Sequence, residues 1–152
     1  MSKRLLRVLL LVCELFLLYL LDNTPVPLPV RPLLLVAAAL SLTGADVAVA
    51  TVCGAVCGFL TDVGGGTAYF AVALALLCFA QSTLLHTVFR NRLLSLWLLS
   101  CGAAAVLLGL SVLLRLLTGE GLSWRVPLRA ALTLLCVLPL SALHRGRRHE
   151  TI

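Results

Sequence analysis

The sequence predicts an all-α integral membrane protein, a single six-helix transmembrane bundle that occupies residues 1–152. Of its 152 residues, 61% are hydrophobic and only 12% are charged, and the mean hydropathy is +1.11. A soluble domain is about half apolar and about a quarter charged. A disordered chain is poor in apolar residues and rich in charge. The composition therefore excludes both classes and makes the lipid bilayer the expected environment.

The spacing of the apolar runs divides the chain into its elements. One membrane span needs about 20 apolar residues. Runs of Leu, Ala and Val alternate here with short clusters of Pro, Gly and charged residues, which break helices. The spans expected from this pattern are residues 5–21, 33–42, 46–61, 67–85, 93–117 and 127–143.

The first expected span, residues 5–21, follows basic residues, as a secretory signal would. It has no small-residue cleavage site, so we expect it to be retained. The turn-forming sequence Asp-Asn-Thr-Pro at 22–25 ends it. Three prolines then make residues 26–32 an extended surface segment, because proline fixes φ and lacks an N–H donor.

Residues 33–62 are compatible with one long span or with two short ones, and charge decides between them. Two spans place the amino terminus, the loop 86–92 and the carboxyl-terminal tail on one side of the membrane. That side then carries eight basic residues, Lys3, Arg4, Arg7, Arg90, Arg92, Arg145, Arg147 and Arg148. The other side carries four, Arg31, Arg115, Arg125 and Arg129. The positive-inside rule therefore favours six spans with both termini cytoplasmic, and this role explains the net charge of +6 without nucleic-acid binding.

The last three expected spans follow from their own boundaries. Three glycines, Gly64–Gly66, separate residues 67–85 from the third span. Residues 93–117 make a helix about 37 Å long, which must tilt in the bilayer. Residues 127–143 begin with Pro127 in the tolerated first turn, and we expect a bend at Pro139.

Small residues recur every fourth position along the third expected span. Asp46, Ala50, Gly54, Gly58 and Asp62 fall on one slowly drifting stripe of a helix. Such small-residue faces let two membrane helices approach closely. The stripe is a packing face inside the bundle or a docking face for a partner, and the pattern is compatible with both.

Three acidic residues are candidates for specific polar contacts. Glu14 lies in the middle of the first span, where a charge is costly, and we expect it either to be protonated or to pair with Gln81, Ser82 or a partner protein. Asp46 lies between two apolar runs. Asp62 is near a helix carboxyl terminus, which disfavours an acid, so we expect a partner such as Arg31 or a backbone N–H of the glycine turn. His86 and His144 are expected on the surface.

Motifs for catalysis and metal binding are absent from the sequence. It has no G-x-S-x-G, no H-E-x-x-H, no P-loop and no cluster of acids. The six cysteines lie inside apolar runs, where they are expected to fill space between helices. The sequence therefore predicts no enzyme, no catalytic residue, no metal site and no cofactor.

Residues 44–92 contain Gly44-Ala45-Asp46, then the segment from Gly54 through Gly58 and Phe59 to Asp62, and then a glycine turn and a long apolar helix. This pattern resembles the MreD family of bacterial rod-shape-determining membrane proteins, in which a short apolar segment is followed by a helix of the form G-x-x-x-G-F-x-x-x-x-D. Gly54, Gly58, Phe59 and Asp62 match in kind, with a compact spacing from Phe59 to Asp62. The chain departs from the family after Asp62, where Gly64-Gly65-Gly66-Thr67 replaces a longer loop.

The resemblance implies a non-enzymatic scaffold subunit of the cell-wall elongation machinery in the bacterial plasma membrane. It implies MreC as the expected partner, with MreB and the RodA–penicillin-binding-protein synthase nearby. The family's fold is similar to that of the substrate-binding subunits of energy-coupling-factor vitamin transporters. The alternative function is therefore such a subunit, but a vitamin site needs convergent polar and aromatic groups. The outer loops offer Arg31, Asp62, Trp124 and Arg125, which ranks this alternative second.

Overall fold

The computed structural model describes residues 3–25, 30–89, 93–121 and 123–149, and in this part of the chain every regular element is an α-helix. These residues form six helices, as predicted: α1 (Lys3–Asn23), α2 (Leu34–Leu42), α3 (Val47–Gly65), α4 (Phe70–Thr87), α5 (Leu93–Leu117) and α6 (Arg125–His149). Of the predicted surface segment, residues 26–29 lie outside the described ranges, as does the basic pair Arg90 and Arg92.

Four of these helices are long and apolar enough to cross a membrane, judged by length and composition: α3, α4, α5 and residues Arg125–His144 of α6. α1 has sufficient length, but Arg7, Glu14 and Asp22 interrupt its apolar sequence. α2 has only nine residues, which correspond to about 14 Å of helix against about 30 Å of hydrocarbon. The chain is therefore a membrane protein in which one central helix is too short to cross alone.

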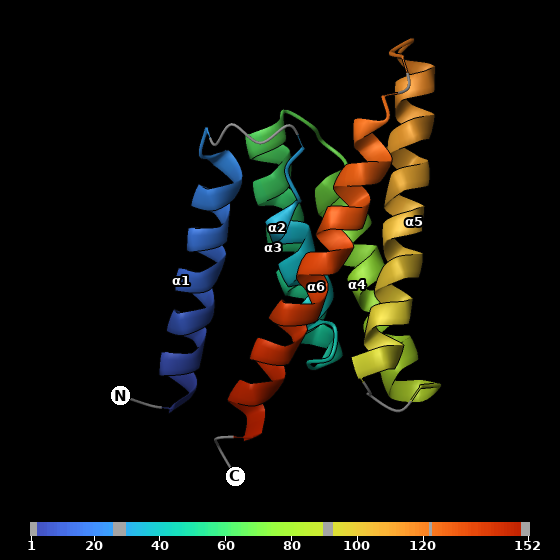
Figure 1. The fold of residues 1–152 in the computed structure, drawn as a ribbon. Coiled ribbons are helices and arrows are strands. Elements are labelled where there is room, and N and C mark those ends of the chain that lie inside the picture. The colour runs from blue at the N-terminus through green and yellow to red at the C-terminus, as the bar shows by residue number, and fades with distance from the viewer. Residues whose placement is uncertain (1–2, 26–29, 90–92, 122, 150–152) are drawn as a thin grey trace.

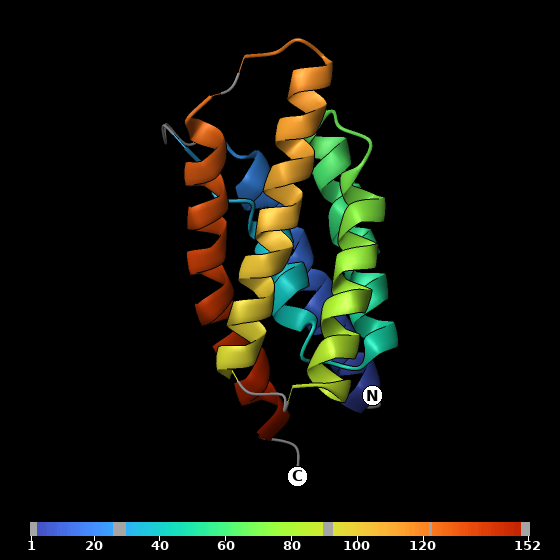
Figure 2. The same ribbon diagram turned by 90° about the vertical axis from the view of Figure 1, so that its right-hand side faces the viewer.

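The helices pack around α2. Residues 35–42 of α2 are buried, and α2 contacts every other helix. Figure 2 shows α2 enclosed by the longer helices. Outward-facing residues of the surrounding helices are large and apolar, for example Val52 and Phe59 of α3 and Leu76 of α4. In a bilayer these side chains face lipid, so the packed interior is a column centred on α2.

The two ends of the bundle differ in the chain segments that they carry. The beginning of α1 and the end of α6 lie at one end of the bundle, here called the terminal end, where α2 and α4 end and α3 and α5 begin (Figure 1). The opposite end, here called the distal end, is where α1, α3 and α5 end and α2, α4 and α6 begin (Figure 1).

The end of α3 corrects the expected boundary at Thr61. The helix continues through Asp62 to Gly65 and ends at Gly66, which has a φ of 67°. The backbone N–H groups of Gly66 and Thr67 both donate to the carbonyl of Asp62. Glycine adopts this left-handed conformation without a steric penalty, so the helix ends where φ becomes positive and not where the glycines begin.

Candidate functional site: a cavity at the distal end

Asp62 joins the end of α3 to the beginning of α4. Its Oδ1 accepts hydrogen bonds from the Thr67 hydroxyl at 2.7 Å and from the Phe70 N–H at 3.0 Å, and its Oδ2 accepts from the Ala71 N–H at 2.9 Å. The first N–H groups of a helix have no partner inside the helix, and they attract negative charge. The carboxylate of Asp62 therefore caps α4, and its position in the last turn of α3 serves the neighbouring helix.

Gly54 and Gly58 bring α3 into direct contact with α4. A Cβ added at Gly58 would lie 2.4 Å from the Phe70 carbonyl oxygen and 2.6 Å from the Ala71 Cα. A Cβ added at Gly54 would lie 2.9 Å from the Cys78 Cβ and from the Leu74 carbonyl oxygen. Backbone cannot move aside as a flexible side chain can, so only glycine allows this approach.

Of the remaining stripe residues, Ala50 is fully buried in the bundle, whereas Asp46 is exposed. Asp46 is the N-cap residue of α3, but its side chain makes no capping hydrogen bond. The structure thus separates two acids that lie on one stripe in the sequence. Asp62 is buried among donors, and Asp46 stands at the exposed beginning of the helix.

A second aspartate caps α2 in the same way. Asp22, at the end of α1, accepts hydrogen bonds from the N–H groups of Leu34 at 3.1 Å and Leu35 at 3.2 Å. The Leu33 N–H donates to the Thr133 hydroxyl of α6 at 2.9 Å. The beginning of α2 is therefore satisfied by side chains of α1 and α6, which allows this helix to start inside the bundle.

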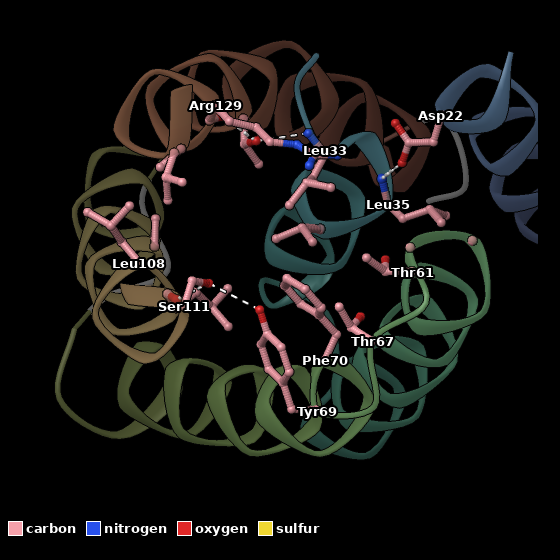
Figure 3. Close-up of a pocket in the computed structure, with 18 of the residues that line it drawn as sticks. Asp22, Leu33, Leu35, Thr61, Thr67, Tyr69, Phe70, Leu108, Ser111 and Arg129 are labelled. Atoms are coloured by element: carbon pink, nitrogen blue, oxygen red, sulfur yellow. Dashed lines mark hydrogen bonds between the residues drawn. The ribbon is translucent and has the colours of Figure 1, made fainter. Parts of the chain in front are cut away.

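A cavity of about 290 Å³ lies directly above this beginning of α2, at the distal end. Figure 3 looks into it and shows Leu33 and Leu35 of the α2 region, Tyr69 and Phe70 at the start of α4, and Leu108 and Ser111 of α5 around the hollow. The longer helices continue past the point where α2 begins, and none of the helices in the described ranges fills the column there. The cavity is thus a direct consequence of the short α2.

The cavity wall has more apolar than polar surface, and its polar residues include Asp22, Asn23, Thr61, Thr67, Tyr69, Ser111 and Thr133. The Tyr69 hydroxyl and the Ser111 hydroxyl share a hydrogen bond of 3.2 Å across the α4–α5 side (Figure 3). The Tyr69 and Phe70 rings stack with centroids 4.6 Å apart. Leu60, Leu107 and Ala104 complete the apolar wall between these groups. Pockets that bind small molecules have this composition, an apolar lining with a few placed polar groups.

Arginines surround the mouth of the cavity. A more open hollow of about 420 Å³, here called the vestibule, is lined by Val30, Arg31, Arg115, Ser123, Arg125, Val126 and Arg129. Arg115, Val126 and Arg129 line both hollows, so the vestibule and the cavity adjoin. The Arg31 guanidinium donates to the Thr24 carbonyl, and Arg129 interacts electrostatically with Asp22, Arg31 and Arg115.

The terminal end of α2 is filled by polar side chains. Gln81 Nε2 donates to the Thr43 hydroxyl at 2.8 Å and to the Ser100 hydroxyl at 3.0 Å. Gln81 Oε1 is buried and has no hydrogen-bond partner. These side chains join α4, α5 and the carboxyl end of α2 and close the column at this end.

Glu14 has a partner that the sequence did not indicate. Its Oε1 lies 3.0 Å from His144 Nε2, and His144 Nδ1 lies 2.9 Å from the Ser41 hydroxyl. The expected partners Gln81 and Ser82 bond elsewhere, Ser82 to the Ala45 carbonyl at 3.4 Å. His144 is a correction as well, because its side chain is only 12% exposed. The chain of contacts ties α1, α6 and α2 together inside the bundle.

The sequence indicates Arg31 and Arg125 as outer-loop residues and Arg31 as a partner for Asp62, but it does not indicate that these two residues gather with Arg115 and Arg129 around one hollow. It indicates Asp22 as part of a turn, and not as the cap of α2. One sign of a charged site is present in the sequence: all four of these arginines lie at segment ends on the same predicted side of the membrane. Among the described residues, no group of three or more His, Cys, Asp or Glu side chains is placed to hold a metal ion. Comparisons of the chain with protein-family models, with curated proteins and with solved structures found no match.

Proposed function

We propose that this protein is a non-enzymatic scaffold subunit of the bacterial cell-wall elongation machinery, of the MreD type, with MreC as its partner. The observation that carries the proposal is the α3–α4 hairpin. Gly54, Gly58 and Asp62, which carry the sequence resemblance, all act there, two by close packing and one by capping. A sequence pattern whose members serve one structural unit is a stronger support than the pattern alone.

The proposal includes a six-span topology in the bacterial plasma membrane, with both termini in the cytoplasm. The beginning of α1 and the end of α6 lie at the same end of the bundle, which supports it (Figure 1). The excess of basic residues in the terminal segments supports this orientation, since cytoplasmic loops retain Lys and Arg. α1 crosses in this topology with Glu14 paired to His144, and α2 crosses together with residues 30–33, which lead into it.

The position of the small-residue stripe bears on where a partner binds. Ala50, Gly54 and Gly58 are buried in the bundle, and the two glycines are covered by α4. A partner helix therefore docks on another surface under this proposal. Site-specific photocrosslinking from the lipid-facing residues of each helix to MreC identifies that surface.

Co-purification tests the scaffold function. The tagged chain is extracted from native membranes in mild detergent, and the proteins retained are identified by mass spectrometry. We expect MreC in near-stoichiometric amount, with RodA and its penicillin-binding protein in smaller amounts. An unrelated six-span protein with the same tag is the control. Recovery of neither MreC nor a wall synthase, from membranes that contain both, contradicts the proposal.

The second candidate function is a substrate-binding subunit of an energy-coupling-factor transporter. The observation that favours it is the cavity of about 290 Å³ at the distal end, which is the outer side in the proposed topology. The same co-purification distinguishes the two functions. A transporter subunit retains a transmembrane partner and ATPases, and it does not retain MreC.

A further inference from the structure

The vestibule concentrates positive charge beside an apolar cavity. Arg115 comes from the end of α5, Arg125 and Arg129 from the beginning of α6, and Arg31 from the segment that leads into α2. The described lining of the vestibule contains no Asp or Glu. Four cations that line one hollow repel one another, and an anion between them relieves the repulsion.

The nearby acids do not neutralise this charge. Both carboxylate oxygens of Asp22 already accept hydrogen bonds, from the N–H groups of Leu34 and Leu35. Asp22 carries a single negative charge against four arginines, and it interacts electrostatically with Arg129. Glu120, in the α5–α6 connection, is exposed and lines neither hollow.

The position of two arginines on α6 adds a second argument. Arg125 is the first residue of α6 and Arg129 follows one turn later, so the two lie on the same face. The beginning of a helix carries partial positive charge and favours anions, so cations there are electrostatically unfavourable. An anion beside Arg125 is stabilised by the guanidinium groups and by the helix end together.

The apolar cavity determines what else the ligand carries. A small free anion needs only the vestibule, whereas the adjoining cavity presents Leu35, Leu60 and Leu107 to whatever enters it. The hollow thus places cations at the mouth and, below them, apolar side chains together with Asp22 and several uncharged polar groups. This polarity matches a molecule with an anionic head and an apolar tail. Guanidinium groups bind phosphate with paired hydrogen bonds, which makes phosphate the best-fitting head.

We infer that the distal end binds a membrane lipid with a phosphate headgroup, the phosphate between Arg115, Arg125 and Arg129 and part of one hydrocarbon chain in the cavity. Basic pockets between transmembrane helices bind anionic lipid headgroups by the same chemistry. The inference needs only that the bundle lies in a membrane, and it does not rest on the scaffold function proposed above. Failure of either proposal leaves the other untouched.

Lipid titration of the delipidated full-length protein, followed by native mass spectrometry, tests the inference. Three probes separate head from tail: dioleoyl phosphatidic acid has both, dioleoylglycerol has only the chains, and glycerol 3-phosphate has only the head. We expect one phosphatidic acid per protein at the tightest site. The other two probes are expected to bind at least about tenfold more weakly, since each lacks one set of contacts.

Variants locate the binding site. Arg125→Gln with Arg129→Gln is expected to weaken phosphatidic acid binding about tenfold or more, because each charge-assisted hydrogen bond contributes strongly. Arg7→Gln is the matched control, since it removes an exposed arginine of α1, the helix whose first residues lie at the terminal end. Ala104→Leu fills part of the cavity and is expected to weaken phosphatidic acid binding without changing that of glycerol 3-phosphate.

Three results overturn the inference. Equal loss in the double variant and in Arg7→Gln means general attraction of anionic lipid to a basic protein. Tight glycerol 3-phosphate binding, with no effect of Ala104→Leu, means a site for a free anion. Equal binding of dioleoylglycerol means that the arginines do not recognise the head. If the double glutamine variant does not fold, Arg125→Lys with Arg129→Lys takes its place. This variant keeps the charge but loses the paired hydrogen bonds of the guanidinium groups, so we expect weaker phosphatidic acid binding in it and in Ala104→Leu. Unchanged binding in both variants overturns the inference.

Discussion

The two ends of α2 differ in what surrounds them, a cavity at the beginning and packed polar side chains at the other end. At its beginning, Asp22 and Thr133 satisfy the first N–H groups, and an apolar cavity lies above them. At its other end, Thr43, Gln81 and Ser100 form a hydrogen-bonded cluster that fills the column. The same nine-residue helix therefore faces a hollow on one side and a plug of side chains on the other.

The difference shows how a bundle accommodates a helix that is too short. The space beyond a short helix is filled by side chains, is filled by lipid or ligand, or stays empty. In every case the N–H and C=O groups at the helix ends need hydrogen-bond partners, because the membrane interior offers none. The terminal end uses side chains from α4 and α5. The distal end uses only caps, which satisfy the backbone and leave the space above it open. Four predictions test this contrast, from the largest expected effect to the smallest.

The largest effect is expected at the wall of the distal end. Gly58→Ala places a Cβ 2.4 Å from the Phe70 carbonyl oxygen, so α4 must move away from α3. We expect a loss of about 3 kcal/mol in the free energy of unfolding, the upper part of the range for overpacking. Unfolding in mixed micelles titrated with SDS measures it. Gly102→Ala is the matched control, because a Cβ there meets nothing within 4 Å; equal losses in the two variants would show that the helices are not in contact.

The next largest effect is expected for Asp62, which caps α4. Asp62→Ala leaves the N–H groups of Phe70 and Ala71 without acceptors, and we expect a loss of about 2 kcal/mol. Asp46→Ala removes the same side chain at an N-cap that makes no side-chain hydrogen bond, so its effect is expected near zero. The same SDS titration compares them. A loss for Asp46→Ala as large as that for Asp62→Ala would contradict the assignment of Asp62 as a cap.

A smaller effect is expected for the polar contact between α1 and α6. Glu14→Ala removes the contact with His144, and we expect a loss of about 1 kcal/mol, typical of polar contacts between membrane helices. Glu14→Gln keeps an acceptor oxygen at the same position and is expected to lose less. Thermal unfolding followed by tryptophan fluorescence ranks the three proteins. The pairing is refuted if the glutamine and alanine variants are equally destabilised.

The smallest effect is expected inside the cavity. Ala103 and Ala104 are adjacent and similarly buried, at 6% and 7% exposure, but only Ala104 lines the cavity. Ala104→Leu has space to fill and is expected to change stability by less than about 0.5 kcal/mol. Ala103→Leu enters packed surroundings and is expected to cost about 1–3 kcal/mol. Similar costs for both substitutions, measured by SDS titration, would mean that the hollow is not present in solution.

Much of the fold could be predicted from the sequence, because a helix is formed by residues that are close together in the chain. Apolar runs and the Pro and Gly clusters between them are contiguous in the sequence, so the six helices were predicted in order and number. The exact end of α3 was missed, because three successive glycines give no local sign of which one adopts positive φ. The contacts of Asp62 lie within nine residues along the chain, and its unfavourable place near a helix end already pointed to a partner.

The sequence by itself determined that this protein is helical, apolar and built for a membrane, because composition and periodicity act over a few turns of chain. Only the tertiary structure decided which distant side chains meet. Glu14 and His144 are 130 positions apart, and Leu33 and Thr133 are 100 apart. The cavity and the arginines at its mouth also depend on side chains that are distant in the sequence. They arise where five helices pass the beginning of a shorter sixth, and such a hollow has no signature in any one segment.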